Sequence, residues 1–315
     1  MKDKEMAKSM YASMYRIRRF EEEVFEFYKR GLMPGLAHLY IGEEAVAVGA
    51  CAAIRKDDYI GSTHRGHGHL VARGADTKRM MAEILGKKTG YCGGKGGSMH
   101  IMDMSLGILG ANGIVGGGIP IATGAGYSCK YRHTDQVVLC FFGDGASNEG
   151  TFHESINMAA AWDLPVVYII ENNQYGITVD INRVTKEHDL AKRAIGYGID
   201  GYTIDGNDME TVYETVSKAV AKARSGGGPS IVECKTYRQH GHNGGDPGNY
   251  RAEGELERWK ERDPIKLFRA KNYLTDEEIA EIEKSVDEEI RQACDYAVES
   301  PYPEESDLMT GIFCE

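Results

Sequence analysis

The sequence predicts a doubly wound α/β fold with a mainly parallel sheet and helical extensions at both ends of the chain. Residues 136–142 (QVVLCFF) and 166–171 (VVYIIE) are continuous apolar runs, which are typical of strands buried on both faces of a parallel sheet. A helical pattern lies between them, and a second strand–helix–strand pattern follows, with strands at 201–206 and 230–237. In a chain of 315 residues, these units indicate one large α/β domain with a helical appendage.

The segments before the central strands alternate between helix and strand. Residues 1–30 have helical spacing and a charged face, and Gly31 ends this helix. A second helix with a face of small residues is expected from residue 43 to about residue 54. A short strand at 59–62 and a helix at 77–85 complete this part.

Two helix starts carry the pattern of a capping box, in which a threonine is followed three residues later by a glutamate. Thr151 and Glu154 predict one such start after the first central strand, and Thr275 and Glu278 predict another near the C-terminus. From residue 256 the chain is charged and helical to its end.

We therefore divide the chain into three parts. Residues 1–58 form a helical N-terminal segment packed on the main domain, residues 59–255 form the α/β domain, and residues 256–315 form a helical C-terminal tail. The repeat pattern of a solenoid is absent from the sequence.

The composition excludes several classes of partner. With 37 basic and 48 acidic residues the chain has a net charge of −11, which disfavours binding to nucleic acid or to an anionic membrane. No apolar run reaches the roughly 18 residues of a membrane span, and the first residues lack the apolar core of a secretory signal. The seven cysteines are scattered, which indicates free thiols in a reducing compartment, and the cytoplasm is the expected location.

Glycine is concentrated in one region, because 13 of the 39 glycines fall between Gly90 and Gly126. Such a cluster marks places where the backbone approaches another group closely or adopts positive φ. The glycines alternate with Met, Ile, Leu and Val, which a solvated linker would lack.

The chemistry is expected where the two central strands end. Asp144 follows the first strand between two glycines, and Asn173 follows the second, so both lie at the edge where open α/β sheets bind ligands. Carboxylate, amide and carbonyl oxygens are ligands suited to magnesium, which completes its shell with water and phosphate oxygens. The helix that begins near 149–151 directs its positive end to the same place and favours a phosphate. The spacing therefore predicts a magnesium–diphosphate site.

The same residues carry a resemblance to a known family. Gly143-Asp144-Gly145, 26 residues and then Asn172-Asn173 resemble the thiamine-diphosphate-binding motif. From about residue 10 to residue 270 the chain resembles the alpha subunit of the thiamine-dependent first component of 2-oxo acid and acetoin dehydrogenase complexes. The segments that carry this resemblance are HLYIGEEAVAVGA, KGGSMH, GANGIVGGGIP, FFGDGASNEGTFHESINMAA, IIENNQYG, TYRQHGH and DPGNYR.

The resemblance implies the thiamine-diphosphate-binding fold, with thiamine diphosphate and Mg²⁺ as cofactors. It makes Asp144, Asn173 and the carbonyl of Tyr175 the magnesium ligands. It also implies contacts of Arg65, Gly145 and Ala146 with the diphosphate. The backbones of Gly113 and Val115 would contact the aminopyrimidine.

The resemblance further implies catalytic histidines. His67 and His242 would face the reacting carbon. His242 would orient or protonate the substrate adduct and would also bind the cofactor, which would order its loop. Pyruvate-specific relatives usually carry Tyr-Arg where this chain has His64 and Arg65, and this segment resembles the acetoin-cleaving branch. His64 could act as the general base for the acetoin hydroxyl, or it could replace a tyrosine hydrogen bond to phosphate. Acetoin is the expected substrate, with pyruvate as the alternative and branched-chain 2-oxo acids a third.

The resemblance also implies partners. The chain has a single diphosphate-binding half, so a separate beta subunit would supply the catalytic glutamate in an α₂β₂ heterotetramer. The glycine-rich surface around 113–126 would suit that contact, and a lipoyl domain of the acyltransferase component would accept the two-carbon unit.

Three other interpretations remain. His64, His67 and His69 form an H-x-x-H-x-H cluster, which suggests a metallohydrolase. Residues 196–201 match G-x-G-x-x-G, but they follow a helical segment and precede a strand, which is the reverse of the dinucleotide-binding context. A purely structural subunit is the third possibility, since the chain cannot supply a whole thiamine site by itself.

Overall fold

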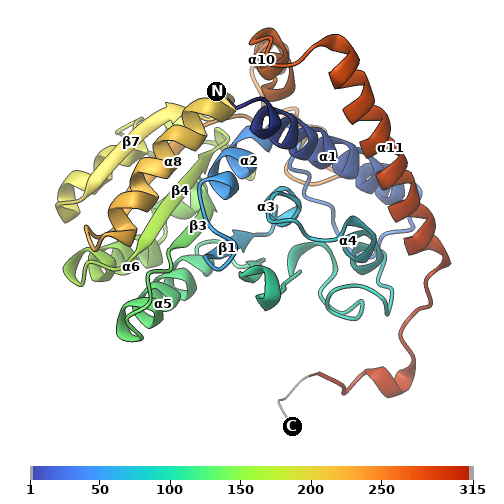
Figure 1. Ribbon diagram of the computed structural model, residues 1–315, viewed down its shortest axis with the longest axis horizontal. Coiled ribbons are helices and arrows are strands. Elements are labelled where there is room, and N and C mark those ends of the chain that lie inside the picture. The colour runs from blue at the N-terminus through green and yellow to red at the C-terminus, as the bar shows by residue number, and fades with distance from the viewer. Residues whose placement is uncertain (1–2, 312–315) are drawn as a thin grey trace.

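The computed structural model describes residues 3–311, and its centre is a six-stranded parallel sheet in the order β2-β1-β3-β4-β8-β7 (Figure 1). All neighbouring strands in this sheet run parallel, which confirms the predicted fold class. The strands of the sheet are β1 (Tyr59–Thr63), β2 (Ile108–Asn112), β3 (Val138–Gly143), β4 (Val166–Asn172), β7 (Asp200–Asp205) and β8 (Ser230–Lys235). A separate two-stranded antiparallel ribbon is formed by β5 (Tyr175–Gly176) and β6 (Val179–Asp180).

Helices cover both faces of the sheet. Their bounds are α1 (Lys4–Lys29), α2 (Glu44–Ala52), α3 (His67–Ala72), α4 (Thr77–Ile84), α5 (Gly118–Tyr131), α6 (Gly150–Ala161), α7 (Ile181–Val184), α8 (Met209–Arg224), α9 (Glu255–Glu261), α10 (Pro264–Ala270) and α11 (Asp276–Glu299). Short 3₁₀ helices lie at Gly97–Met99, Met104–Leu106, Gly145–Asn148, Leu190–Tyr197 and Glu305–Asp307.

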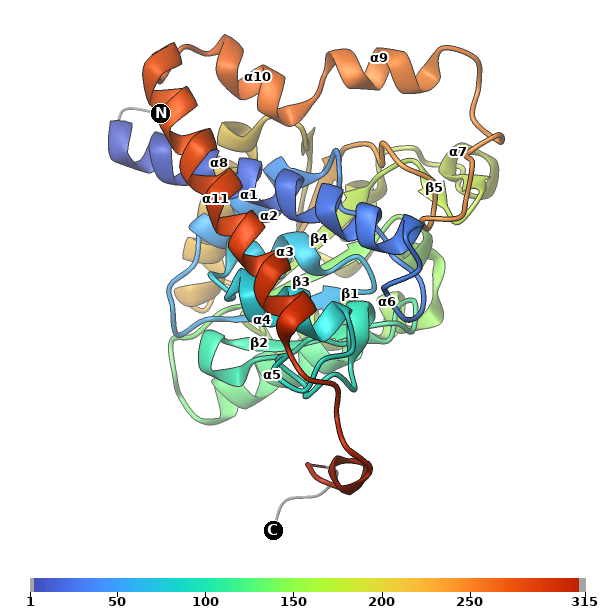
Figure 2. The same cartoon turned by 90° about the vertical axis from the view of Figure 1, so that its right-hand side faces the viewer.

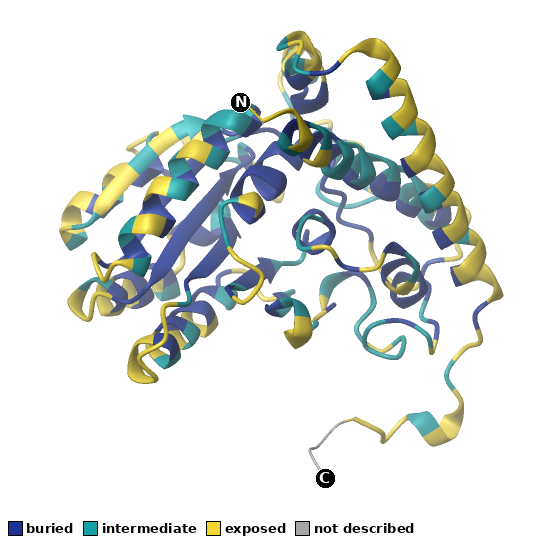
Figure 3. Ribbon diagram, in the orientation of Figure 1, coloured by how far each residue is buried: buried dark blue, intermediate teal, exposed yellow. Residues whose placement is uncertain are grey.

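The strand β3 shows how one apolar run serves two layers. Because successive side chains of a strand point to opposite faces, Cys140 and Phe142 pack with α5 and α6, whereas Leu139 and Phe141 pack with α2 and α8. Figure 3 shows the central strands buried, with the exposed residues on the outer sides of the helices. The absence of polar residues from this run follows from burial on both faces.

The helical extensions join the main core. α1 and α11 lie side by side (Figures 1 and 2), and the hydroxyl of Tyr11 donates a hydrogen bond to Glu283 at 2.5 Å. Met14, Ile17 and Phe20 on α1 are fully buried in the same apolar cluster as α2, α4 and α8. The division of the chain at residues 58 and 255 remains a prediction. Within residues 3–311, none of the helices has the length and apolar character needed to span a bilayer.

Two local expectations need correction or completion. The predicted capping box of Thr151 and Glu154 is absent, because α6 begins at Gly150 and the Thr151 hydroxyl instead donates to the Gly116 carbonyl at 3.3 Å. The box of Thr275 and Glu278 is present at the start of α11. The glycine-rich region also contains β2 and α5, two elements for which the sequence pattern provided no prediction, because glycine disfavours both helix and strand.

Candidate active site

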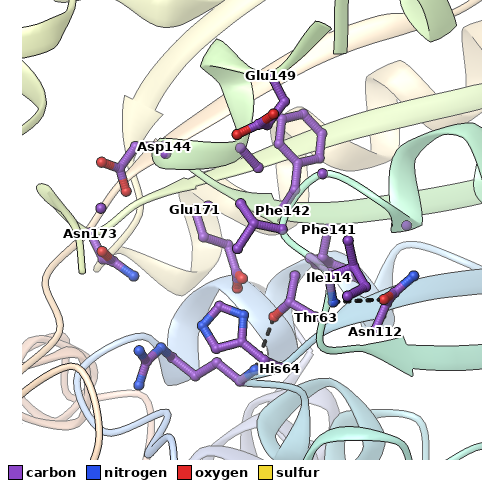
Figure 4. Close-up of a pocket in the computed structure, with 18 of the residues that line it drawn as sticks. Thr63, His64, Asn112, Ile114, Phe141, Phe142, Asp144, Glu149, Glu171 and Asn173 are labelled. Atoms are coloured by element: carbon purple, nitrogen blue, oxygen red, sulfur yellow. Dashed lines mark hydrogen bonds between the residues drawn. The ribbon is translucent and has the colours of Figure 1, made fainter. Parts of the chain in front are cut away.

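A cavity of about 310 Å³ lies at the carboxyl edge of the sheet, beside the ends of β1, β3 and β4 (Figure 4). Parallel strands end on the same edge, and Gly143 of β3 pairs with Glu171 of β4, so the residues that follow both strands meet here. Of the residues predicted for the site, nine line this cavity: His64, Arg65, Val115, Asp144, Gly145, Ala146, Asn173, Tyr175 and His242. Gly113 and His67 are not part of its lining.

Asp144 and Asn173 each present a buried oxygen without a hydrogen-bond partner among residues 3–311. The Asp144 side chain is almost fully buried and its Oδ2 is unpartnered, and burial raises the pKa of this carboxyl to about 7. The Asn173 amide nitrogen donates to Glu43 at 3.2 Å, which leaves its Oδ1 unpartnered as well. Buried polar atoms normally have partners, so these two oxygens at the ends of adjacent strands are suited to bind a cation.

Two guanidinium groups face the same cavity. Arg65 is buried and donates to the carbonyls of Leu39 at 2.7 Å and His242 at 3.0 Å. Burial, followed by repulsion from Arg238, lowers the pKa of Arg65 to about 10, so it remains protonated at neutral pH. Arg238 donates to the Ile177 carbonyl at 2.7 Å, and its buried Nε has no partner in the part of the chain that the structure describes. These charges suit an anionic group in the cavity.

Three imidazole rings pack together near Arg65, and two of them, those of His64 and His242, line the cavity. The His38 ring lies 5.0 Å from both His64 and His242, centroid to centroid, and the last two lie 5.7 Å apart. Burial lowers the pKa of His64 to about 2, of His38 to about 3 and of His242 to about 4, and Arg65 adds to each shift. All three rings are therefore neutral at pH 7. Within the described residues, the Nδ1 atoms of His38 and His242 lack hydrogen-bond partners.

The sequence pattern of the family "Dehydrogenase E1 component" matches residues 12–306. This chain belongs to that family. Its relatives include the alpha subunit of acetoin:2,6-dichlorophenolindophenol oxidoreductase from Bacillus subtilis, with 49% identity over 98% of this chain and 94% of the relative. The protein of the same name from Cupriavidus necator is 46% identical over 99% and 95%, respectively. The pyruvate dehydrogenase E1 component subunit alpha of Rickettsia bellii is 41% identical over 96% and 94%.

Family membership makes this E1 chain an oxidoreductase component of the alpha type, as both the main prediction and its pyruvate alternative required. The family depends in general on thiamine diphosphate. The alpha designation of the relatives implies a beta-type partner. The interpretations as a metallohydrolase or a nicotinamide enzyme have no support among these relatives.

The geometry of the H-x-x-H-x-H segment also disagrees with a metal cluster. His64 faces the cavity, whereas His67 lies between Glu21, at 3.0 Å, and Ser98, at 2.9 Å. His69 lies 2.9 Å from Glu171. In the part of the chain that the structure describes, no three His, Cys, Asp or Glu side chains are grouped to hold a metal ion. The segment passes from β1 into α3, so its side chains point in different directions.

His67 therefore differs from its predicted placement. Both ring nitrogens have partners inside the protein and the side chain is almost fully buried, so the ring does not face the cavity. Gly113 also lies outside the cavity lining, but its neighbours Asn112 and Ile114 belong to it. The predicted backbone contact of Gly113 with the cofactor remains a prediction.

His38, Arg238 and Glu171 were not predicted as site residues from the sequence. The first two occur in HLYIGEE and TYRQHGH, segments that carried the family resemblance, but no local pattern assigned them to the site. Glu171 is the penultimate residue of β4 and lines the cavity, where the Tyr40 hydroxyl donates a hydrogen bond to it. A polar residue at the end of an apolar strand was the available signal.

Proposed function

We propose that this E1 chain is the alpha subunit of a thiamine-diphosphate-dependent enzyme that cleaves acetoin and passes the two-carbon unit to a lipoyl group. The proposal rests on one observation. Asp144 and Asn173 follow two adjacent strands, line the same cavity, and each has a buried oxygen without a hydrogen-bond partner among the described residues. Two hard oxygen donors beside two guanidinium groups fit a magnesium ion with a diphosphate.

The residues fit the cofactor as follows. Asp144, Asn173 and the carbonyl of Tyr175 would hold Mg²⁺, and Arg65 would compensate the diphosphate charge. The other proposed contacts are the backbones of Gly145 and Ala146 for the diphosphate and of Gly113 and Val115 for the aminopyrimidine. When bound, thiamine diphosphate supplies the carbon nucleophile and the electron sink of the reaction.

The histidines would move protons at the substrate. A neutral imidazole at His64 can accept the hydroxyl proton of acetoin, because the ring borders the cavity and burial keeps it unprotonated. His242, whose ring lies 5.7 Å from that of His64, would orient the substrate oxygen. His67, which contacts Glu21 and Ser98, would support this wall of the cavity from behind, and a direct role for it remains a prediction.

The neutral histidines favour a neutral hydroxyketone over an anion. A 2-oxo acid would bring a carboxylate against rings that burial keeps uncharged, with no compensating charge from them. The relatives at 49% and 46% identity are named for acetoin, and the relative at 41% is named for pyruvate. Pyruvate is the second candidate because Arg65 and Arg238 place two cations at the cavity.

The proposed assembly is an α₂β₂ heterotetramer in which the beta subunit supplies the catalytic glutamate. An apolar stripe on α5 supports a protein contact, since Ile121, Tyr127 and Tyr131 are exposed at helical spacing. Gly124, within this stripe, has open space above it and would allow close approach of a partner. The lipoyl domain of an acyltransferase component would then receive the product.

We also propose a cytoplasmic location. The six cysteines among residues 3–311 are all free, which supports a reducing compartment. Cys314 lies outside the described residues.

The test is reconstitution of this chain with its cognate beta chain, thiamine diphosphate and Mg²⁺. Reduction of 2,6-dichlorophenolindophenol is then measured with acetoin and with pyruvate. We expect a higher kcat/KM for acetoin and no turnover without the beta chain. A higher kcat/KM for pyruvate would reverse the substrate assignment, and full turnover by this chain alone would contradict the proposed assembly.

A further inference from the structure

A fully buried carboxylate on α4 organises the glycine-rich segment. The Glu83 side chain accepts hydrogen bonds from four backbone N–H groups of this segment and is buried completely. Its Oε2 accepts from Cys92 at 2.8 Å and Gly94 at 2.9 Å, and its Oε1 accepts from Gly96 at 2.7 Å and Gly97 at 3.0 Å. A concave run of N–H groups is a normal environment for an anion, and here the anion belongs to the protein itself.

The segment is wrapped closely around this carboxylate. The two remaining N–H groups of residues 92–97, those of Gly93 and Lys95, donate to carbonyls of the same turn. A Cβ atom at Gly90 would lie only 2.3 Å from Glu83 Oε2, so a side chain cannot be accommodated there. Gly94 has φ +79, and a Cβ on it would lie 2.6 Å from the Gly86 carbonyl oxygen. The positions of these glycines therefore depend on Glu83 and on its neighbours.

The segment continues directly to the cavity wall. Ser98, the next residue, binds His67 through its side chain and its carbonyl at 2.9 and 3.1 Å. Ile101 accepts a hydrogen bond from the Ala111 backbone at 3.1 Å, which ties the segment to β2. The ring of His100 lies 3.1 Å from the position of a Cβ on Gly113. The end of β2 leads to Asn112 and Val115 in the cavity lining.

We propose that Glu83 is a positioning residue for the cofactor site. Its carboxylate fixes residues 90–97, and through residues 98–103 it fixes the end of β2 that forms one wall of the cavity. The four donors to Glu83 lie outside the cavity lining, so Glu83 takes no part in the chemistry. The inference rests on the proposed function for the identity of the cofactor.

The main test uses Glu83→Gln in the enzyme assembled with its beta chain. The glutamine amide has the same shape, but its NH₂ group faces two of the four N–H donors and cannot accept their hydrogen bonds. Hydrogen exchange of a peptide covering residues 90–99 should therefore accelerate by about tenfold. Half-saturation by thiamine diphosphate at fixed Mg²⁺ should shift upward by about tenfold, with kcat at saturating cofactor within about twofold of the wild type. An unchanged cofactor affinity in this variant would overturn the inference.

A control variant separates this effect from a general loss of stability. Thr77 lies on the same helix as Glu83. The substitution Thr77→Val removes the hydrogen bond from Thr77 to Glu289, but it leaves Glu83 and its four donors intact. We expect its cofactor half-saturation to match the wild type. If cofactor binding weakens equally in Thr77→Val, any disturbance of α4 affects the site, which would contradict the specific role of Glu83.

A pair of glycine variants tests the same connection without changing Glu83. Gly93 and Gly94 both have positive φ, so alanine is strained at either, but only at Gly94 does its Cβ meet backbone. Gly94→Ala should reproduce the shift in cofactor half-saturation, and Gly93→Ala should reproduce less of it. Equal shifts in the two variants would contradict the inference. If calorimetry finds no thiamine diphosphate binding to the wild-type enzyme, the proposed function fails, and the exchange measurement still decides whether Glu83 orders residues 90–97.

Discussion

Two buried aspartates lie at opposite edges of the sheet, and they differ in how their charge is satisfied. Asp58, at the amino edge before β1, accepts two hydrogen bonds from Arg224, at 3.0 and 2.6 Å, and one from the Val137 backbone at 2.8 Å. Asp144, at the carboxyl edge after β3, is equally buried but has an unpartnered oxygen and a pKa raised by burial to about 7. The paired carboxylate serves the fold, whereas the unpaired one is available for a ligand.

The largest expected effect concerns stability at the amino edge. Asp58→Ala leaves Arg224 without its buried partner, so the free energy of unfolding should fall by about 3 kcal/mol. Asp144→Ala removes a carboxylate that burial already disfavours, so it should change stability by less than about 1 kcal/mol. Urea unfolding at one protein concentration compares the two variants. Equal losses would mean that Asp144 also has a structural role.

The second expected effect concerns cofactor affinity, which should depend on the aspartate at the carboxyl edge of the sheet. Asp144→Ala should weaken magnesium-dependent binding of thiamine diphosphate to the assembled enzyme by more than about 100-fold, because it removes a proposed metal ligand. Isothermal titration calorimetry measures the affinity. Asp3→Asn is the control, since Asp3 caps α1 by accepting from the Glu5 backbone and asparagine caps a helix equally well. An Asp144→Ala enzyme with wild-type affinity would remove the main support for the cofactor assignment.

A third effect links the neutral histidines to pH. Burial lowers the pKa of His64 to about 2, whereas the unfolded chain titrates near 6.5, so below pH 6.5 the unfolded state binds a proton that the folded state does not. Stability should therefore fall as the pH decreases from 6.5, by about 2 kcal/mol at pH 5 for this residue.

The measurement is the free energy of unfolding at pH 6.5 and pH 5 for the wild type and His64→Gln. The variant should lose the part of the pH dependence that belongs to His64. An identical pH dependence in both proteins would show that the folded state protonates His64 normally.

The smallest effect concerns substrate choice. His64→Tyr removes the neutral base proposed for the acetoin hydroxyl, and the ratio of kcat/KM for acetoin to that for pyruvate should fall by about tenfold. Steady-state rates of 2,6-dichlorophenolindophenol reduction provide the ratio. If kcat/KM falls equally for both substrates, His64 acts on the cofactor and does not determine the choice of substrate.

Local patterns determined the parts of the protein that depend on short stretches of chain. Continuous apolar runs predicted β3 and β4, because a strand buried on both faces needs no polar residues. Their spacing then brought Asp144 and Asn173 to one edge, since parallel strands end together. The start of α11 was predicted equally well, because its capping box requires only four consecutive residues.

Only the tertiary structure decided the contacts made across long distances in the chain. His64 and His67 stand three residues apart in one motif, yet one borders the cavity and the other is held by Glu21 and Ser98. The three clustered histidines, His38, His64 and His242, likewise come from separate segments. The spacing of apolar residues in the sequence specifies which face of a helix or strand is apolar. The direction and the partners of each polar side chain depend on segments that folding brings together.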